Sequence, residues 1–345
     1  MRNETSPGQR AVAWRTGLAC AAIAWVGCGA AQPPAEVPPS CQAAPTCGPD
    51  EESCCTSLEV PGGTFFRTYT NDGSGPADQA DPATVSRFRL DKYLVTVGRF
   101  RQFRAALDSD VGFAPPVGAG KHTHLNGGKG LTNGAAAGTY ETGWVEEASS
   151  HITPTNDNLG CNFDYATWTN EPGERETLPM NCINWFEAYA FCIWDHGFLP
   201  SEVELEFAAA GGKEHRQYPW GSIPPGQASQ LAIYGCYYPD GSGTCGSVGN
   251  IAPVGTATAG PGRWGHFDLS GELAQWTLDW FSSFHTPCVD CANLSEESGM
   301  AIRDGYFQSA APILVSSYRN NGFYPVNRFF NFGFRCARAP SPEGR

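Results

Sequence analysis

Two histidines separated by one residue are the first side chains whose spacing suggests chemistry. His122 and His124 flank Thr123, so both imidazoles would lie on one face of an extended strand. Imidazole is a common ligand for transition metals, and such a pair would supply two ligands. The sequence shows no third ligand beside them, so an exposed loop is the alternative to a metal site.

Cysteines are the next reactive group, and the chain has 14 of them. Cys20 and Cys28 belong to the N-terminal segment, and removing these 2 from 14 leaves 12, an even number. Even sets of this size are typical of disulfide-bonded proteins in an oxidising compartment. The count therefore predicts an exported protein.

Two groups of cysteines leave a choice of chemistry. The group between 41 and 55 could bind zinc, but no histidine at zinc spacing accompanies it, so disulfides are favoured: Cys41, Cys47, Cys54 and Cys55. Cys288 and Cys291 could form a redox pair. No βαβ pattern surrounds them, which favours a small-loop structural disulfide.

The N-terminal segment contains features of a targeting signal. A basic start and a short apolar run over 16–26 predict a signal peptide over 1–27, because such a run cannot span a bilayer. Trp25-Val26-Gly27-Cys28 resembles a bacterial lipoprotein box, with Cys28 as the lipidated first residue of the mature chain. The proline-rich segment 28–53 would be an extended tether. These features predict an exported, membrane-anchored lipoprotein, periplasmic or at the cell surface.

Composition restricts the partners. The formal net charge is -13, and no cluster of lysine and arginine offsets it locally. A chain of this charge would be repelled by phosphate backbones. Nucleic acid is therefore not expected as a partner.

Helix and strand signals show which elements would position these groups. Alternating polar and apolar residues over 87–93 predict a strand, and Thr96 can cap a following helix. The pattern over 185–194 predicts a second helix. Ser201 and Glu204 form a capping box for a third. With a loop-rich insertion over 108–180, these few helices indicate an α+β domain.

Four phrases occur in fixed order along the chain. They are VPGGTF at 60–65, LPSEVE at 199–204, GHFDLSG at 265–271 with Gln275-Trp276 after it, and GFRCA at 333–337. Together they resemble the formylglycine-generating enzyme (sulfatase-modifying factor) family. The resemblance implies an irregular C-type-lectin-like fold over 54–340, with few helices, many loops and disulfide staples.

The resemblance also points to where the reaction would occur. Family members that make formylglycine oxidise a substrate cysteine with oxygen, using two cysteines that hold copper. The corresponding positions here are Ala311 and Ser316. Methyl and hydroxyl groups cannot replace thiolate as ligands for copper(I), so copper is not expected and the catalytic residues are unknown.

Two structural features follow from the resemblance. It implies a disulfide between Cys192 and Cys336. It also implies a structural calcium site, with oxygen ligands from Asp268, Gly271, Leu273 and Gln275. Gln275 replaces a family glutamate, which predicts weaker binding; a tight turn held by Asp268 alone is the alternative.

Two functions are consistent with these residues. The first is a binding or structural module at the cell envelope that lacks the copper cysteines and takes a protein or glycan ligand. The second is an oxidoreductase of the same family, either generating formylglycine or acting as a non-haem metal oxygenase, with other ligands such as His122 and His124. The missing cysteine pair favours the first.

Overall fold

A computed structural model describes residues 37–43, 45–110, 112–320 and 322–341. The predicted signal peptide at 1–27 and Cys28 lie outside the described residues. Within the described part, no helix has both the length and the apolar character needed to cross a membrane. The α-helices are α1 (Val97–Leu107), α2 (Asn156–Leu159), α3 (Trp185–Trp194) and α4 (Glu202–Ala210).

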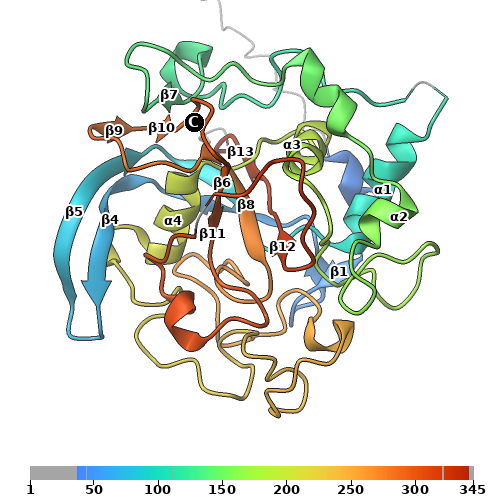
Figure 1. Cartoon of the computed structure of the whole chain (residues 1–345). Coiled ribbons are helices and arrows are strands. Elements are labelled where there is room, and N and C mark those ends of the chain that lie inside the picture. The colour runs from blue at the N-terminus through green and yellow to red at the C-terminus, as the bar shows by residue number, and fades with distance from the viewer. Residues whose placement is uncertain (1–36, 44, 111, 321, 342–345) are drawn as a thin grey trace, which may run out of the picture. The chain divides into compact units, whose positions relative to one another are not determined.

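The strands are short and belong to several small sheets (Figure 1). Two sheets form the centre, in the orders β11-β8-β12 and β13-β6-β3, and a third contains the long hairpin of β4 and β5 with β9 beside it. Two-stranded ladders join β1 to β2 and β10 to β7. The bounds are β1 (Thr46–Cys47), β2 (Glu52–Ser53), β3 (Ser57–Val60), β4 (Gly63–Asn71), β5 (Pro76–Val85), β6 (Phe88–Asp91), β7 (Thr132–Asn133), β8 (Ala274–Trp280), β9 (Cys288–Val289), β10 (Cys291–Ala292), β11 (Met300–Arg303), β12 (Phe332–Gly333) and β13 (Ala337–Arg338).

The predicted fold class is confirmed: this is an irregular α+β domain with few helices and many loops. Thr96 caps α1 by accepting a hydrogen bond from the Arg99 amide at 3.3 Å. The capping box of Ser201 and Glu204 begins α4, and Gly211 ends that helix in the left-handed region at φ 65°. Local sequence chemistry therefore fixes the helix that carries much of the site described below.

The described part of the predicted tether packs against the rest of the domain from Pro39 onward. Ser40 is fully buried; its amide donates to Asp195 Oδ1 at 3.0 Å, and its hydroxyl accepts from Arg99 Nε at 2.9 Å. Disulfides join Cys41 to Cys55 and Cys47 to Cys54, which confirms disulfides over zinc for this group. The packed domain therefore includes residues 39–43 and 45–53, which lie within the predicted tether 28–53.

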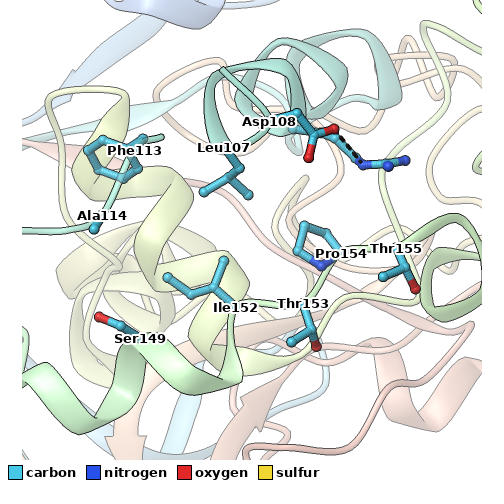
Figure 2. Close-up of a pocket in the computed structure, with 10 residues that line it drawn as sticks. Leu107, Asp108, Phe113, Ala114, Ser149, Ile152, Thr153, Pro154 and Thr155 are labelled. Carbon is cyan, nitrogen blue, oxygen red and sulfur yellow. Dashed lines mark ion pairs between the residues drawn. The ribbon is translucent and has the colours of Figure 1, made fainter. Parts of the chain in front are cut away.

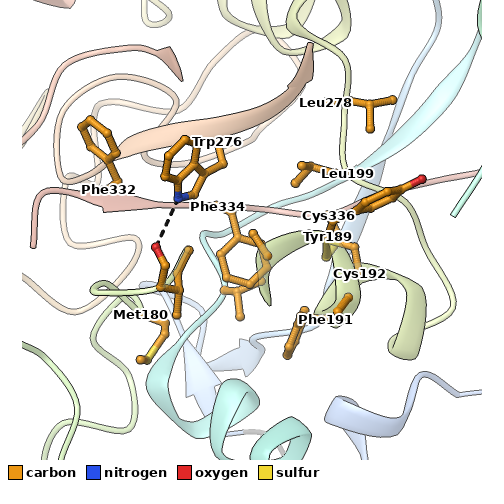
Figure 3. Packing of buried hydrophobic residues seen from close by; sticks show 14 of the residues in the cluster. Met180, Tyr189, Phe191, Cys192, Leu199, Trp276, Leu278, Phe332, Phe334 and Cys336 are labelled. Carbon is orange, nitrogen blue, oxygen red and sulfur yellow. Dashed lines mark hydrogen bonds between the residues drawn. A yellow bond between two sulfur atoms is a disulfide. The ribbon is translucent and has the colours of Figure 1, made fainter. Parts of the chain in front are cut away.

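The apolar core lies between α1, α3 and the central sheet (Figure 3). Trp276 of β8 meets Phe332 edge to face at 5.3 Å, and Phe191 of α3 meets Phe334 in the same way at 5.3 Å. Beside them Cys192 and Cys336 form a disulfide that joins α3 to the chain just before β13. This is the pair that the family resemblance implies, and it closes a loop over a sequence separation of 144 residues.

Candidate functional site

Ala311 and Ser316, which the resemblance matches to the family's copper cysteines, lie on the segment beside α4. Ser316 is fully buried, and its hydroxyl donates to the carbonyl oxygen of Ala209, the penultimate residue of α4, at 3.1 Å. The Ser316 amide donates to Gln217 O at 2.8 Å, and its carbonyl accepts from Arg303 Nη2 at 2.8 Å. Ala311 begins a short 3₁₀ helix, Ala311–Leu314, and offers only a methyl group. Both positions are therefore used in packing.

No described cysteine has a free thiol. All twelve form disulfides: Cys41–Cys55, Cys47–Cys54, Cys161–Cys182, Cys192–Cys336, Cys236–Cys245 and Cys288–Cys291. The pairing of Cys288 with Cys291 agrees with the structural interpretation of that motif. Thiolate is the nucleophile and the soft ligand of cysteine chemistry. None of the described cysteines therefore offers a free thiolate.

A buried charge cluster lies next to Ser316, between α4 and the central sheet. Arg303 of β11 donates to the Ser316 carbonyl and lies 3.4 Å from Glu206 Oε1. Arg319 Nη2 donates to Glu202 Oε2 at 2.6 Å. Asp279 of β8 accepts from the Glu202 amide at 2.7 Å. The charged groups in this cluster mainly pair with one another.

Two carboxyl groups of this cluster hold their protons unusually tightly. Burial raises the pKa of Glu206 to about 8, despite the opposing charge of Arg303. Burial, reinforced by the charge of Glu202, raises the pKa of Asp279 to about 7. Shifted carboxyl groups often mark catalytic sites. The adjoining cavity, however, is only about 20 Å³, room for roughly one water molecule.

Two of the predicted calcium ligands, Asp268 and Gln275, contact Arg335, a fully buried residue of the GFRCA phrase. Asp268 Oδ2 accepts from the Gly255 amide at 2.8 Å, and burial raises the pKa of Asp268 to about 6. Gln275 Oε1 accepts from Arg335 Nε at 2.7 Å, while its Nε2 donates to Asp304 Oδ2 at 3.0 Å. The side-chain oxygen of Gln275 thus faces a guanidinium, which predicts weak calcium binding. Calcium here stays a prediction, as do the carbonyls of Gly271 and Leu273 as ligands.

The two histidines have different environments. His122 is fully buried, with Nδ1 at 3.0 Å from Glu141 Oε2 and Nε2 at 3.1 Å from Glu204 Oε2. Burial opposes protonation, but the charges of Glu204 and Glu141 outweigh it and raise the pKa of His122 to about 10. Neither nitrogen of His124 has a hydrogen-bond partner, and its ring stacks on Phe198 at 5.6 Å.

This geometry argues against a metal pair. Both nitrogens of His122 face carboxylates as donors, so no lone pair is left for a metal. Across the described residues, no group of three His, Cys, Asp or Glu side chains is arranged to hold an ion. Sequence reasoning missed Glu141 and Glu204 as partners because they lie 19 and 82 residues away along the chain.

Three larger cavities lie away from the predicted site residues, and one of them, about 360 Å³, is lined mainly by residues of segments 46–51 and 253–258. A second is an open groove of about 390 Å³ at the end of α1, where Leu107, Phe113 and Ile152 give an apolar floor and Arg104 pairs with Asp108 at 3.5 Å (Figure 2). Another, about 220 Å³, lies between segment 141–148, α3 and β8, and its lining includes Trp144, Trp185, Phe186, Tyr189 and Trp280. None of the three contains Ala311 or Ser316 among its lining residues.

Comparison with known proteins assigns the chain to a protein family. Residues 43–340 match the model of the sulfatase-modifying factor enzyme 1-like domain. The chain is 26% identical over 302 residues to the formylglycine-generating enzyme of Streptomyces coelicolor, covering 81% of this chain and 88% of that one. It is also 26% identical over 299 residues to inactive C-alpha-formylglycine-generating enzyme 2 of Mus musculus, covering 81% and 84%.

A solved structure agrees in fold. PvdO from Pseudomonas aeruginosa matches with a TM-score of 0.51 at 20% sequence identity, covering 82% of this chain and 94% of that one. The family's phrases, its irregular fold and its disulfide between α3 and the GFRCA phrase thus occur together in one domain. This chain belongs to the sulfatase-modifying factor enzyme 1-like family.

Proposed function

We propose that this protein is a non-catalytic member of its family that binds a ligand at the cell envelope. The observation that carries the proposal is the state of its sulfur atoms: all twelve described cysteines are in disulfides, and Ala311 and Ser316 occupy the copper positions. A formylglycine-generating reaction needs a thiolate that this domain does not offer.

The surroundings of Ser316 support the same conclusion. Its hydroxyl donates to Ala209, and the neighbouring arginines pair with Glu202 and Glu206. A catalytic site keeps groups available for the substrate, whereas here Ser316, Arg319 and Glu202 are hydrogen-bonded within the protein. Glu206 is the exception, since neither of its carboxyl oxygens has a hydrogen-bond partner. The cavity beside Glu202, Asp279 and Arg319 is about 20 Å³, which leaves no room for a peptide side chain.

The alternative, an oxidoreductase that uses other ligands, has less support. It would rely on His122 and His124, yet both nitrogens of His122 are committed to Glu141 and Glu204. His124 alone supplies one imidazole. We therefore favour binding over oxidation.

The proposal includes export and anchoring. Six disulfides in the described residues are typical of a protein that folds in an oxidising compartment. Cys28 would carry the lipid, and segment 29–38 would link it to the packed domain. Palmitate-analogue labelling should mark the wild type and leave Cys28→Ala unlabelled; a mature, unlabelled wild-type form that begins at another residue would contradict the anchor.

The activity test uses a Cys-x-Pro-x-Arg peptide with copper and oxygen. We expect mass spectrometry to show no aldehyde with the wild-type protein, while a known formylglycine-generating enzyme converts the peptide under the same conditions. Aldehyde formation by the wild type would overturn the proposal. The double variant Ala311→Cys/Ser316→Cys tests whether the cysteine pair alone is sufficient for aldehyde formation. In this variant the hydrogen bond from the Ser316 hydroxyl to Ala209 is also lost.

A further inference from the structure

An aromatic pocket lies between α3 and β8, on the opposite side of β8 from the buried charge cluster. Its volume is about 220 Å³, the space of roughly seven water molecules. Segment 141–148, helix α3 and strand β8 provide its wall, and Val145 at its edge is 46% exposed. The side chains that matter here are Trp144, Trp185, Tyr189, Leu278, Trp280 and Leu294.

Contacts with the protein hold these rings in place. Trp185 Nε1 donates to the carbonyl oxygen of Thr277 at 2.8 Å, and Trp144 Nε1 donates to Ser149 Oγ at 3.1 Å. The ring of Tyr189 lies 5.3 Å from that of Trp185 and 5.5 Å from that of Trp144. Because these two indole N–H groups are already bonded, what the rings offer a ligand is apolar surface and π electrons.

The pocket also contains one acidic residue, Glu141, which is 5% exposed. Its carboxylate contacts one side of the His122 imidazole, and Glu204 contacts the other. Both ring nitrogens face carboxylates, so the imidazole carries one positive charge against two negative charges. Among the described residues, the recorded ion pairs of Glu141 and Glu204 are those with His122. The buried triad therefore has a net charge of about -1.

The negative charge acts on the pocket wall. Burial, and then the charge of Glu141, raises the pKa of Tyr189 well above its usual value. The backbone amides of His122 and Leu131 donate to Glu141 Oε2 at 3.0 and 3.2 Å, so the carboxylate is hydrogen-bonded but keeps its charge. This negative charge would repel an anionic ligand and attract a cationic one.

We propose that this pocket binds a compact organic cation of the alkylammonium type. Rings around a methylated ammonium stabilise it through cation–π attraction, and the nearby triad adds a compensating charge. A hard metal cation would instead need several oxygen ligands, which aromatic walls do not supply. The inference deepens the proposed binding role by naming a ligand class.

The rim favours a free cation over a lipid headgroup. Glu146 and Glu147 are exposed at the start of the 3₁₀ helix Glu146–His151, which follows Val145 directly. Their charges would repel a phosphate attached to the ammonium group. Free choline should therefore bind more tightly than phosphocholine.

The test is isothermal titration of the purified full chain at low ionic strength with three probes. These are choline, phosphocholine and the neutral isostere of choline in which carbon replaces nitrogen. We expect choline to bind at least about ten-fold more tightly than the neutral alcohol, a difference within the range of desolvated cation–π contacts. Equal affinities would overturn the proposal, as would the absence of saturable choline binding or tighter binding of phosphocholine.

Variants locate the site. Trp280→Leu keeps apolar bulk but removes an aromatic wall, so it should weaken choline binding about ten-fold and change binding of the alcohol far less. Trp220→Leu is the matched control, because Trp220 stacks on Tyr218 in a different cluster and should leave both affinities unchanged. If choline binding fell equally in both variants, the aromatic pocket would not be the site.

Glu141→Gln tests the charge. It should lower choline affinity and leave alcohol affinity unchanged; unchanged choline affinity in a folded variant would contradict the electrostatic argument. If this variant does not fold, the comparison of Trp280→Leu with Trp220→Leu still decides. Loss of the cation proposal would leave the non-catalytic proposal standing, because that proposal is tested by aldehyde formation.

Discussion

Strand β8 is seven residues long, and its successive side chains point to opposite faces. One face is apolar and the other is polar. Trp276 and Leu278 point into the apolar core on the α3 side (Figure 3). On the α4 side, Thr277 donates to the Ala301 carbonyl at 2.9 Å and Asp279 accepts from the Glu202 amide at 2.7 Å. One strand thus separates an aromatic core from a buried charge cluster.

The comparison shows which half of the domain has surface left for a ligand. On the charged side, the Ser316 hydroxyl donates to Ala209, and the cavity beside Glu202 and Asp279 is about 20 Å³. On the aromatic side the pocket is about 220 Å³, and its walls include Trp185 and Trp280. Of the two sides of β8, the aromatic side therefore has the larger space for a ligand.

The largest expected effect concerns His122, which connects the two sides through Glu204 of α4 and Glu141 of the pocket. His122→Ala should lower the free energy of unfolding by about 3–5 kcal/mol, because it leaves two buried carboxylates facing each other. Urea unfolding measures this change. His124→Ala is the matched control and should cost less, since neither nitrogen of His124 has a hydrogen-bond partner; equal losses would refute the role assigned to His122.

The second prediction concerns the covalent support of the aromatic side. Cys192→Ser should lower the free energy of unfolding by about 2–5 kcal/mol, because the disulfide to Cys336 restricts a long loop in the unfolded chain. Thermal and denaturant unfolding report the loss. Peptide mapping without reduction should recover the two segments joined, and two free thiols there would be incompatible with this interpretation.

The third prediction concerns Glu206 on the charged side. Below about pH 4.5 the carboxyl is protonated in folded and unfolded chains alike. Between about 4.5 and 8 the unfolded chain releases the proton while the folded protein keeps it, so stability falls as pH rises. Arg303, Glu202, Arg67 and Arg319 are the charged groups that face Glu206.

Glu206→Gln removes this titration. Its stability relative to the wild type should rise between pH 5 and pH 8, by on the order of 1–3 kcal/mol. Denaturant unfolding at both values measures the difference. A difference that stays constant with pH would show that Glu206 does not titrate in this range.

The smallest expected effect concerns calcium. Chelation should lower the melting temperature of the wild type slightly, following RT ln(1 + [L]/Kd), because Gln275 offers an oxygen that already faces Arg335. Asp268→Asn should remove the response. Asparagine suits the backbone of Asp268, which has φ 52°, and keeps an acceptor for the Gly255 amide. The same response in both proteins would place calcium elsewhere.

Local signals in the sequence predicted the elements well. Helix starts were predictable from Thr96 and from the pair Ser201 and Glu204. The side-chain oxygens of these residues accept hydrogen bonds from backbone amides at the start of the helix, which is a local interaction. The helix over 185–194 was also correct. Its cap was missed, although Asn184 with Glu187 three positions later is the same kind of local signal.

Contacts distant in sequence were not predictable from pattern alone. The partners of His122 come from an irregular insertion and from α4, and nothing local pairs them. The same holds for Ser40, whose burial depends on Asp195 and Arg99, 155 and 59 residues away. The resemblance to a family supplied Cys192 and Cys336 where spacing could not.

The paired disulfides at the start of the domain have a mechanical consequence. A pull from the N-terminal side reaches Cys41 and passes through its sulfur atom to Cys55, then directly into β3. The intervening residues 42–54 cannot lengthen under that tension, because the covalent bond bypasses them. If the domain is held at a surface by this end, the distance between Cys41 and Cys55 would stay constant under a pulling force. Reduction of this disulfide would allow the chain between the two cysteines to extend before any strand separated.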